Sequence, residues 1–277
     1  MTSGRRHGLG RQRGAVVGLV ILGGLALMAL GAPWLSPRDP IKTAARDALQ
    51  PPGARFVLGS DQFGRDVASR VLHGARVSLT VGLIAVSIAV ALGAPLGLVS
   101  GYYGGRLDGL IMRVMDVLLA FPGILLALAI VSVLTPGLTN VMIAVGLSAV
   151  PTYARLVRAS VLSARENLYV EAARALGGRD LGILARYILP NVVAPLIVTA
   201  TLGLGTAILS AAALGFLGLG SQPPQPEWGR MLSEGRDYLR EAWWISTFPG
   251  LGIMLTVLAM NLLGDGLRDI LDPRLQV

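Results

Sequence analysis

The sequence predicts an all-α membrane protein with six transmembrane helices. Of its 277 residues, 53% are hydrophobic and only 14% are charged, whereas an ordinary soluble domain has roughly 25% charged residues. The mean hydropathy of +0.64 indicates more apolar surface than a soluble fold of one or two domains can bury. The charged residues also lie between long uncharged stretches, which is typical of a chain that crosses a membrane several times.

Five uncharged stretches are long enough to cross the hydrocarbon core, which takes about 20 apolar residues in a helix. The third stretch holds the turn sequence Thr-Pro-Gly-Leu-Thr-Asn at 135–140, so it is expected to form two spans. The fourth has no such break before the proline-rich segment 221–226 and is expected to form one. The first span lies within 14–37, and the other five are predicted at 77–101, 115–134, 140–157, 191–217 and 243–264.

The loops between the spans predict the orientation of the chain. With the N-terminus in the cytoplasm, 14 of the 24 basic residues lie on the cytoplasmic side, a bias typical of inner loops. Both termini are therefore expected in the cytoplasm. The basic residues before the first span would also suit a cleaved secretory signal, but the apolar run 15–35 is long for one and Pro33 disfavours cleavage. An uncleaved anchor is the preferred interpretation.

Residues needed for several kinds of catalysis are missing from the sequence. There is no cysteine, and His7 and His73 are the only histidines, so neither a metal site nor a thiol nucleophile is expected. The single lysine, Lys42, lacks the glycine-rich surroundings of a phosphate-binding loop. The formal charge of +8 comes from arginines scattered around the predicted span ends, which favours lipid headgroups over nucleic acid. No catalytic, cofactor-binding or metal-binding residue is predicted, and the chain is not expected to be an enzyme.

The uncharged spans also bear on the class of transporter. A secondary carrier that works alone is expected to hold ionisable residues inside the membrane, and the five stretches contain none. A membrane enzyme is opposed by the lack of any catalytic constellation. The sequence therefore favours a transport subunit that takes its energy from a partner protein.

The longest predicted cytoplasmic loop, 158–190, carries an amphipathic pattern. A helix over 166–177, ended by Gly177-Gly178, would hold one apolar stripe at helical spacing, made of Tyr169, Ala172, Ala173 and Leu176. Asp180 is expected to cap a second helix, which Pro190 ends at the membrane. Two interpretations of the first helix remain open: an interfacial helix lying on the bilayer, or a docking helix whose alanines let another protein approach closely.

This loop resembles the EAA loop of ABC importer permeases. The resemblance rests on Glu-Ala-Ala at 171–173, glycine at 177 and Leu-Pro at 189–190, while Tyr187 stands where the family pattern has isoleucine. In that family the loop forms the coupling helix, which docks in a groove of the cytoplasmic ATPase subunit. The resemblance therefore implies an ATPase-coupling role for Glu171, Ala172, Ala173, Leu176 and Gly177.

Further segments resemble one branch of the family, the permeases for di- and oligopeptides, glutathione and nickel. They are 58–66, 69–70, 76–79, 215–220, 223–229, 261–269 and 272–273. The fold implied is that of a MetI-like, type I ABC importer permease with an extra N-terminal helix. The transmembrane domain would then be 75–264, after an N-terminal tail, first helix and extracytoplasmic segment in 1–74, and before a cytoplasmic tail at 265–277.

The outer segments hold candidate contacts with an external binding protein, which are Asp61, Arg65, Glu227 and Trp228. Two plainer interpretations stand beside this one. The first is a solvated helix face made of Arg65, Asp66 and Arg70. The second is a belt of interfacial aromatic residues made of Trp228, Trp243 and Trp244.

The resemblance implies one permease subunit of an ATP-driven importer of short peptides, multi-pass in the bacterial cytoplasmic (inner) membrane. Nickel and glutathione importers are the alternatives, and a carrier working alone is less favoured. The implied partners are a second homologous permease, two ATPase subunits that bind ATP and magnesium, an extracytoplasmic substrate-binding protein and membrane lipid. No nucleic acid is expected.

Overall fold

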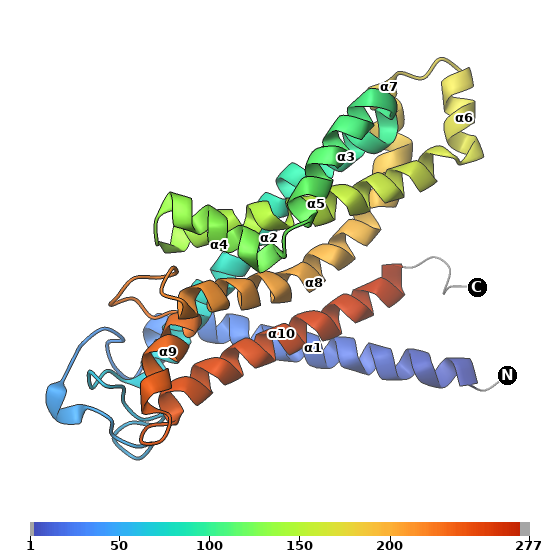
Figure 1. Ribbon diagram of the computed structural model, residues 1–277. Helices are drawn as coiled ribbons and strands as arrows, with labels where there is room; N and C mark the ends of the chain where they lie inside the picture. The colour runs from blue at the N-terminus through green and yellow to red at the C-terminus, as the bar shows by residue number, and fades with distance from the viewer. Residues whose placement is uncertain (1–2, 272–277) are drawn as a thin grey trace.

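The chain, described over residues 3–271 by a computed structural model, is a bundle of long helices with short helices at both ends (Figure 1). The long bundle is formed by α1 (Ser3–Leu35), α2 (Val67–Tyr103), α3 (Gly105–Leu119), α4 (Gly123–Leu134), α5 (Leu138–Arg165), α8 (Leu189–Phe216) and α10 (Trp244–Leu271). One end of the bundle, the α6 end, carries α6 (Leu168–Ala175) and α7 (Asp180–Ile183). The opposite end, the α9 end, carries α9 (Trp228–Gly235).

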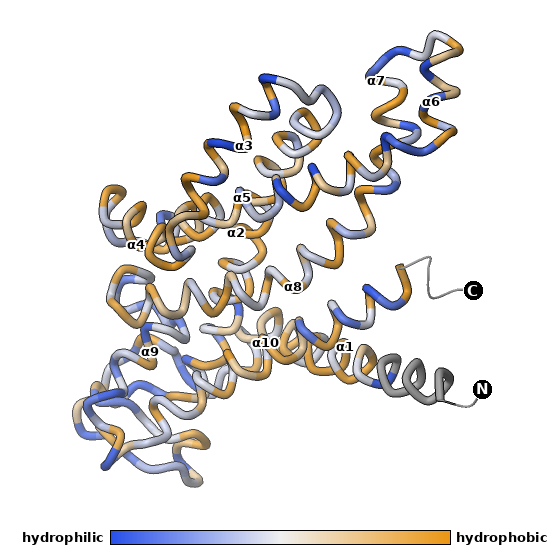
Figure 2. The backbone as a smooth tube through the Cα atoms, turned by 45° about the vertical axis from the view of Figure 1, so that its right-hand side comes forward, coloured by the Kyte–Doolittle hydropathy of each residue, from blue (hydrophilic) through white to orange (hydrophobic). Residues whose placement is uncertain are grey.

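The expected all-α membrane architecture is confirmed. Five helical segments are each long and apolar enough to span a membrane, namely 13–35, 67–103, 138–165, 180–216 and 244–271. Helices α3 and α4 together are long and apolar enough for a sixth crossing. Figure 2 shows hydrophobic residues along the middle of the bundle and hydrophilic ones gathered toward its two ends.

The third predicted span, 115–134, is wrong as a single straight helix. The chain instead forms α3 and α4, which are bent by 90° relative to each other. Pro122 lies at the break, where it supplies no N–H and disfavours a helical conformation at Phe121. The composition changes at this bend, because α3 carries Arg106, Asp108, Arg113 and Asp116 whereas α4 has no charged residue.

Two other helix boundaries differ from the prediction. Helix α2 begins well before residue 77, because the Asp66 side chain accepts a 2.7 Å hydrogen bond from the backbone N–H of Ser69 and caps its first turn. Pro190 does not end a helix. It lies in the first turn of α8, where a proline is tolerated, and a π-helical turn at Leu184–Ile188 joins α7 to α8.

Helix α10 extends past the predicted end of the last span to Leu271. The first part of the expected tail is therefore helical. The predicted helix stop at 272–273 lies outside the described residues.

Helices α2 and α5 form the most extensive helix pair among the described residues. Glycines recur every four residues on the side of α2 that faces α5, at positions 93, 97 and 101. A Cβ atom at Gly93 would lie 2.7 Å from the Val150 carbonyl oxygen, and one at Gly97 would overlap the Ala154 carbonyl oxygen. The two backbones therefore pack in direct contact, as small residues at this spacing allow.

Gly97→Val is expected to force α2 and α5 apart. Overpacking of this kind costs about 1–3 kcal/mol, which should lower the melting temperature of the purified protein by about 3–10 °C. Gly24→Val is the matched control, since a Cβ atom at Gly24 in α1 would meet nothing within 4 Å. Equal melting temperatures for the two variants would contradict the close α2–α5 packing.

Candidate functional site

The segment between α5 and α8 forms the short helix that the sequence predicts, with slightly tighter bounds. Asn167 ends α5, since its side-chain amide donates a 2.9 Å hydrogen bond to the Ala164 carbonyl oxygen. Helix α6 stops before Gly177, whose φ of +80° is cheapest for glycine. The N–H of Gly178 then bonds the Ala173 carbonyl oxygen at 3.0 Å, which completes a glycine C-cap. We call residues 166–180 the coupling segment.

Helix α6 packs on the bundle through a face other than the predicted stripe. Val170 is fully buried, together with the cluster formed by the ends of α2, α5 and α8. Of the predicted stripe, Ala173 is partly buried, while Tyr169, Ala172 and Leu176 are exposed. Leu176 is 89% exposed. The predicted docking residues Glu171, Ala172, Leu176 and Gly177 therefore lie together on a free surface.

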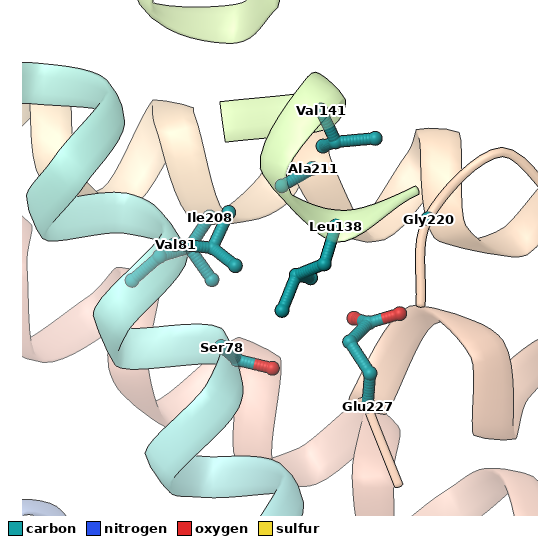
Figure 3. A pocket seen from close by; sticks show the side chains of 8 residues that line it. All are labelled: Ser78, Val81, Leu138, Val141, Ile208, Ala211, Gly220 and Glu227. Carbon is teal, nitrogen blue, oxygen red and sulfur yellow. The ribbon is translucent and has the colours of Figure 1, made fainter. Parts of the chain in front are cut away.

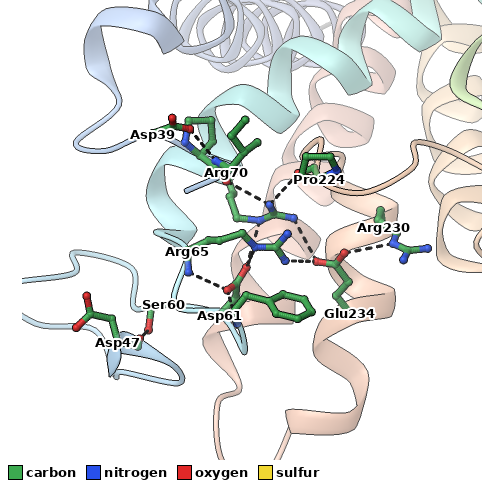
Figure 4. Close-up of polar contacts among 12 residues, drawn as sticks. Asp39, Asp47, Ser60, Asp61, Arg65, Arg70, Pro224, Arg230 and Glu234 are labelled. Atoms are coloured by element: carbon green, nitrogen blue, oxygen red, sulfur yellow. Dashed lines mark hydrogen bonds and ion pairs between the residues drawn. The ribbon is translucent and has the colours of Figure 1, made fainter. Parts of the chain in front are cut away.

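A buried network of charged residues lies at the α9 end (Figure 4). The Arg65 guanidinium pairs with the Asp61 carboxylate at 2.5 Å and with the Glu234 carboxylate at 2.7 Å. The Arg70 guanidinium lies 3.2 Å from Glu234 and 3.5 Å from Asp61, and Arg230 reaches Glu234 at 3.3 Å. The network joins the segment before α2, the first turn of α2 and helix α9.

The expected solvated helix face at Arg65, Asp66 and Arg70 is therefore wrong. All three side chains are buried, and Arg70 is only 1% exposed. They are covered because the segment before α2 folds back over the helix start and α9 packs against it. Burying such charges is costly unless they are paired, and here each arginine has a carboxylate partner.

Trp228, Trp243 and Trp244 do not form an aromatic belt. Trp228 is buried and its indole N–H donates a 3.1 Å hydrogen bond to the Val71 carbonyl oxygen in α2. Trp244 is buried as well, and it donates to the Ser60 carbonyl oxygen at 2.9 Å. Trp243 alone of the three is half exposed. Trp228 and Trp244 instead hydrogen-bond to α2 and to the segment before it.

Glu227 caps α9 from a buried position. Its carboxylate accepts hydrogen bonds from the backbone N–H groups of Gly229 at 2.7 Å and Arg230 at 2.9 Å. Burial raises the pKa of Glu227, and the two backbone hydrogen bonds oppose this effect. The carboxylate lines a small cavity of about 10 Å³, which is about enough for one water molecule. Figure 3 shows the hydroxyl of Ser78 on the same cavity.

The four residues predicted to contact a binding protein are buried, whereas such contacts are expected to be exposed. The side chains of Asp61, Arg65, Glu227 and Trp228 are all buried within this chain. In this conformation they are not available to a partner. They lie inside the α9 end, where Phe63 and residues 236–237 and 239–241 are among the exposed ones.

Two larger cavities lie along α8. One of about 530 Å³ is lined by residues of α5, α8 and α10, with Arg268 its charged lining residue. The other, of about 470 Å³, is lined from α2, α4, α5 and α8, and none of its lining residues carries a charge. The two share Thr199 and Leu202 in their linings. Hydroxyl groups surround the second, from Ser148, Thr152, Tyr153, Thr199, Thr206 and Ser210.

Several residues of these sites were missed by sequence reasoning. The pairing of Arg65 and Arg70 with Glu234 joins positions far apart in the chain, and nothing in one sequence predicts it. The glycines at 93, 97 and 101 could have been found from their four-residue spacing. Over residues 3–271 there is no group of three or more His, Cys, Asp or Glu side chains that could hold a metal ion.

Fold and site together define a multi-pass helical membrane protein. A short helix between two of its spans, α6, presents an exposed face, an arrangement that suits a transport subunit. Residues 93–277 match the family described as "Binding-protein-dependent transport system inner membrane component", and residues 6–52 match "N-terminal TM domain of oligopeptide transport permease C". The chain belongs to the binding-protein-dependent transport system inner membrane component family, the permeases of ABC importers. The family resemblance drawn from the sequence is confirmed.

Relatives match nearly the whole chain. The dipeptide transport system permease protein DppC of Alkalihalophilus pseudofirmus is 51% identical, with 95% of this chain and 86% of the relative covered. The di/tripeptide transport system permease protein DppC of Pseudomonas aeruginosa is 50% identical, covering 95% and 89%. The glutathione transport system permease protein GsiD of Escherichia coli O6:K15:H31 is 49% identical, covering 96% and 88%.

A solved structure shares the fold. It is described as "Inward facing conformations of the MetNI methionine ABC transporter: CY5 native crystal form". The match has a TM-score of 0.59 at 21% identity and covers 73% of this chain and 96% of the other. The MetI-like type I importer permease fold is therefore confirmed.

Proposed function

We propose that this chain is one permease subunit of an ATP-driven importer of short peptides in the bacterial cytoplasmic membrane. The observation that carries the proposal is the identity of about half the residues, over nearly the full length, with permeases named for dipeptides and di/tripeptides. ATP would be hydrolysed by separate subunits, and a second permease and an extracytoplasmic binding protein would complete the transporter.

In this proposal the α6 end and both termini are cytoplasmic. The described ends of α1 and α10 lie at the same end of the bundle as α6, which supports this topology (Figure 1). The excess of arginine in the segments assigned to that side supports it too. The segment before α2 and the segment around α9 would then face the extracytoplasmic side, where a binding protein would meet the exposed residues 236–237 and 239–241.

The coupling segment would dock on an ATPase subunit. The 28 residues of α5 extend over about 42 Å, whereas the hydrocarbon core is about 30 Å thick. The end of α5 therefore carries α6 beyond the hydrocarbon, which favours docking on a protein over lying in the bilayer surface. The exposed side chains of Ala172 and Leu176 offer the small and apolar contacts that such a surface uses.

The hydroxyl-lined cavity between α2, α4, α5 and α8 would form part of the passage. Hydroxyl groups both donate and accept hydrogen bonds, so they match the amide groups that every peptide carries. A lining without charge offers no ion pair that would favour one charged peptide side chain over another. Substrate choice would then fall to the binding protein, and this chain would pass varied short peptides.

Cysteines placed in this cavity are expected to react with a charged thiol reagent in the assembled transporter. The chain has no native cysteine, so Ser148→Cys and Thr206→Cys are each unique probes, read as a mass shift of this chain. Dialanine supplied during turnover should slow their modification. Ser87→Cys, exposed on the outside of α2, is the control and should stay unmodified within lipid. Absence of modification at both cavity positions in every nucleotide state would contradict the passage.

Glutathione is the second candidate substrate, because a permease named for glutathione is 49% identical to this chain. It is itself a tripeptide, so the same uncharged lining would accommodate it. Direct binding of dialanine, trialanine, glutathione and Ni²⁺ to the matching external binding protein would separate these candidates, including the nickel alternative.

Reconstituted uptake tests the proposed function. Vesicles that hold this chain, its partner permease and the ATPase subunits, supplied with binding protein, are expected to accumulate dialanine only when ATP is hydrolysed. Vesicles without the ATPase subunits should accumulate none. Uptake driven by an ion gradient in vesicles that hold this chain alone would overturn the proposal in favour of a secondary carrier.

A further inference from the structure

The end of α2 lies directly under the coupling segment. Tyr102, the penultimate residue of α2, is 5% exposed and packs in the cluster that also holds Val170 of α6 and Ile183 of α7. Its neighbour Tyr103 is 54% exposed. Arg165, the last residue of α5, donates a 3.0 Å hydrogen bond to the Gly101 carbonyl oxygen, which fixes the two helix ends to each other.

Both halves of the coupling segment contact Tyr102. After the Gly177-Gly178 turn, the Asp180 carboxylate accepts a 2.6 Å hydrogen bond from the Tyr102 hydroxyl. Before that turn, the Arg174 guanidinium carbon lies 5.4 Å from the centre of the Tyr102 ring, within cation–π range. One side chain of α2 therefore holds the helix before the turn and the helix after it.

Helix α2 can carry a displacement of its Tyr102 end to the opposite side of the bundle. The glycines at 93 and 97 pack its backbone in direct contact with α5. At its other end, Arg70 joins the buried charged network and the Val71 carbonyl oxygen accepts the hydrogen bond from Trp228. Helix α2 therefore connects the coupling segment to the α9 end, with polar contacts at Tyr102 on one side and at Arg70 and Val71 on the other.

We propose that Tyr102 is the positioning residue that transmits movement of the coupling segment to α2, through its hydrogen bond to Asp180 and its contact with Arg174. This inference rests on the proposed function. The coupling segment also has side-chain hydrogen bonds to two other spanning helices. Asn167 donates to the Ala164 carbonyl oxygen of α5 at 2.9 Å, and Asn191 of α8 donates to the Tyr169 hydroxyl at 3.1 Å. Tyr102 supplies the corresponding attachment to α2.

Tyr102→Phe removes the hydroxyl and keeps the ring. In the reconstituted transporter, the ratio of dialanine imported to ATP hydrolysed is expected to fall by about 3- to 10-fold, the scale set by losing one hydrogen bond to a charged group. A merely structural role would lower ATP hydrolysis and uptake together and leave the ratio unchanged. Tyr103→Phe is the matched control, and its ratio should equal that of the wild type.

Variants of Asp180, an exposed residue, test the same bond from its other side. Asp180→Ala should reproduce the loss, while Asp180→Asn keeps an acceptor oxygen and should largely restore the ratio. The double variant Tyr102→Phe with Asp180→Ala should be no worse than either single variant. If Tyr102→Phe fails to assemble, the contrast between the two Asp180 variants decides alone.

The outcomes separate this inference from the proposed function. If the wild-type transporter imports dialanine at the expense of ATP and the ratio is unchanged in both Tyr102→Phe and Asp180→Ala, the role of Tyr102 is overturned and the peptide importer stands. If the wild type imports no dialanine with all subunits present, the proposed function itself fails.

Discussion

Arg70→Met is expected to destabilise this protein more than any other single change at the α9 end. After the substitution, Arg65 is the one arginine that still pairs with both Asp61 and Glu234. The change also removes the hydrogen bonds that Arg70 donates to the carbonyl oxygens of Pro40 and Pro224, both at 3.3 Å. Breaking a buried charge network by removing one member costs about 3–5 kcal/mol. The melting temperature of the purified protein should fall by about 10 °C or more.

Arg240→Met is the control for this prediction. Arg240 lies at the same end of the bundle but is exposed, and exposed charges contribute little to stability. Its melting temperature should stay within about 2 °C of the wild type, because surface substitutions usually change stability by less than about 0.5 kcal/mol. A fall for Arg70→Met no larger than that for Arg240→Met would show that the network does not stabilise the α9 end.

Leu176→Glu is expected to abolish most ATP-driven uptake without disturbing the fold. The side chain is almost fully exposed, so the change costs the isolated chain little, yet it places a charge at the centre of the proposed apolar contact. Losing one strong interface residue costs about 2 kcal/mol or more, which corresponds to about 30-fold weaker binding of the ATPase subunits. Copurification and uptake in vesicles measure the two effects.

Leu239→Glu is the matched control, since Leu239 is an exposed leucine at the opposite end of the bundle. It should leave ATPase association unchanged. Equal ATPase binding by Leu176→Glu and the wild type would count against α6 as the docking surface, and would favour the interfacial-helix interpretation that the sequence left open.

Much of the fold could be predicted from the sequence because a membrane-spanning helix requires a long, uncharged and apolar stretch. Uncharged stretches long enough to span the hydrocarbon core located the five helical segments that can each cross a membrane, but not the bent pair of α3 and α4. The helix at 168–175 and its end near Gly177 followed from local pattern and glycine geometry. These features depend on residues that are close together in the chain, so a single sequence is enough to predict them.

The features that the sequence did not predict depend on tertiary contacts. Arg65 and Arg70 look like solvent-facing charges until Glu234 is brought beside them. Val170 packs on the bundle, with Ala173 as the one residue of the expected stripe beside it, because the position of α6 is set by the ends of α2 and α5. The 90° bend between α3 and α4 was not predicted, although the change from the charged, amphipathic α3 to the uncharged α4, with Pro122 at the break, offered a local signal for it.

The most direct test of the account is a single-cysteine cross-link from position 176 in the complete transporter. Because the chain has no native cysteine, Leu176→Cys carries a unique thiol for a short photoactivated cross-linker. A cross-linked product between this chain and an ATPase subunit is expected. A membrane-impermeant thiol reagent added outside cells should not modify position 176. Cross-linking to lipid alone, or modification from outside, would contradict it.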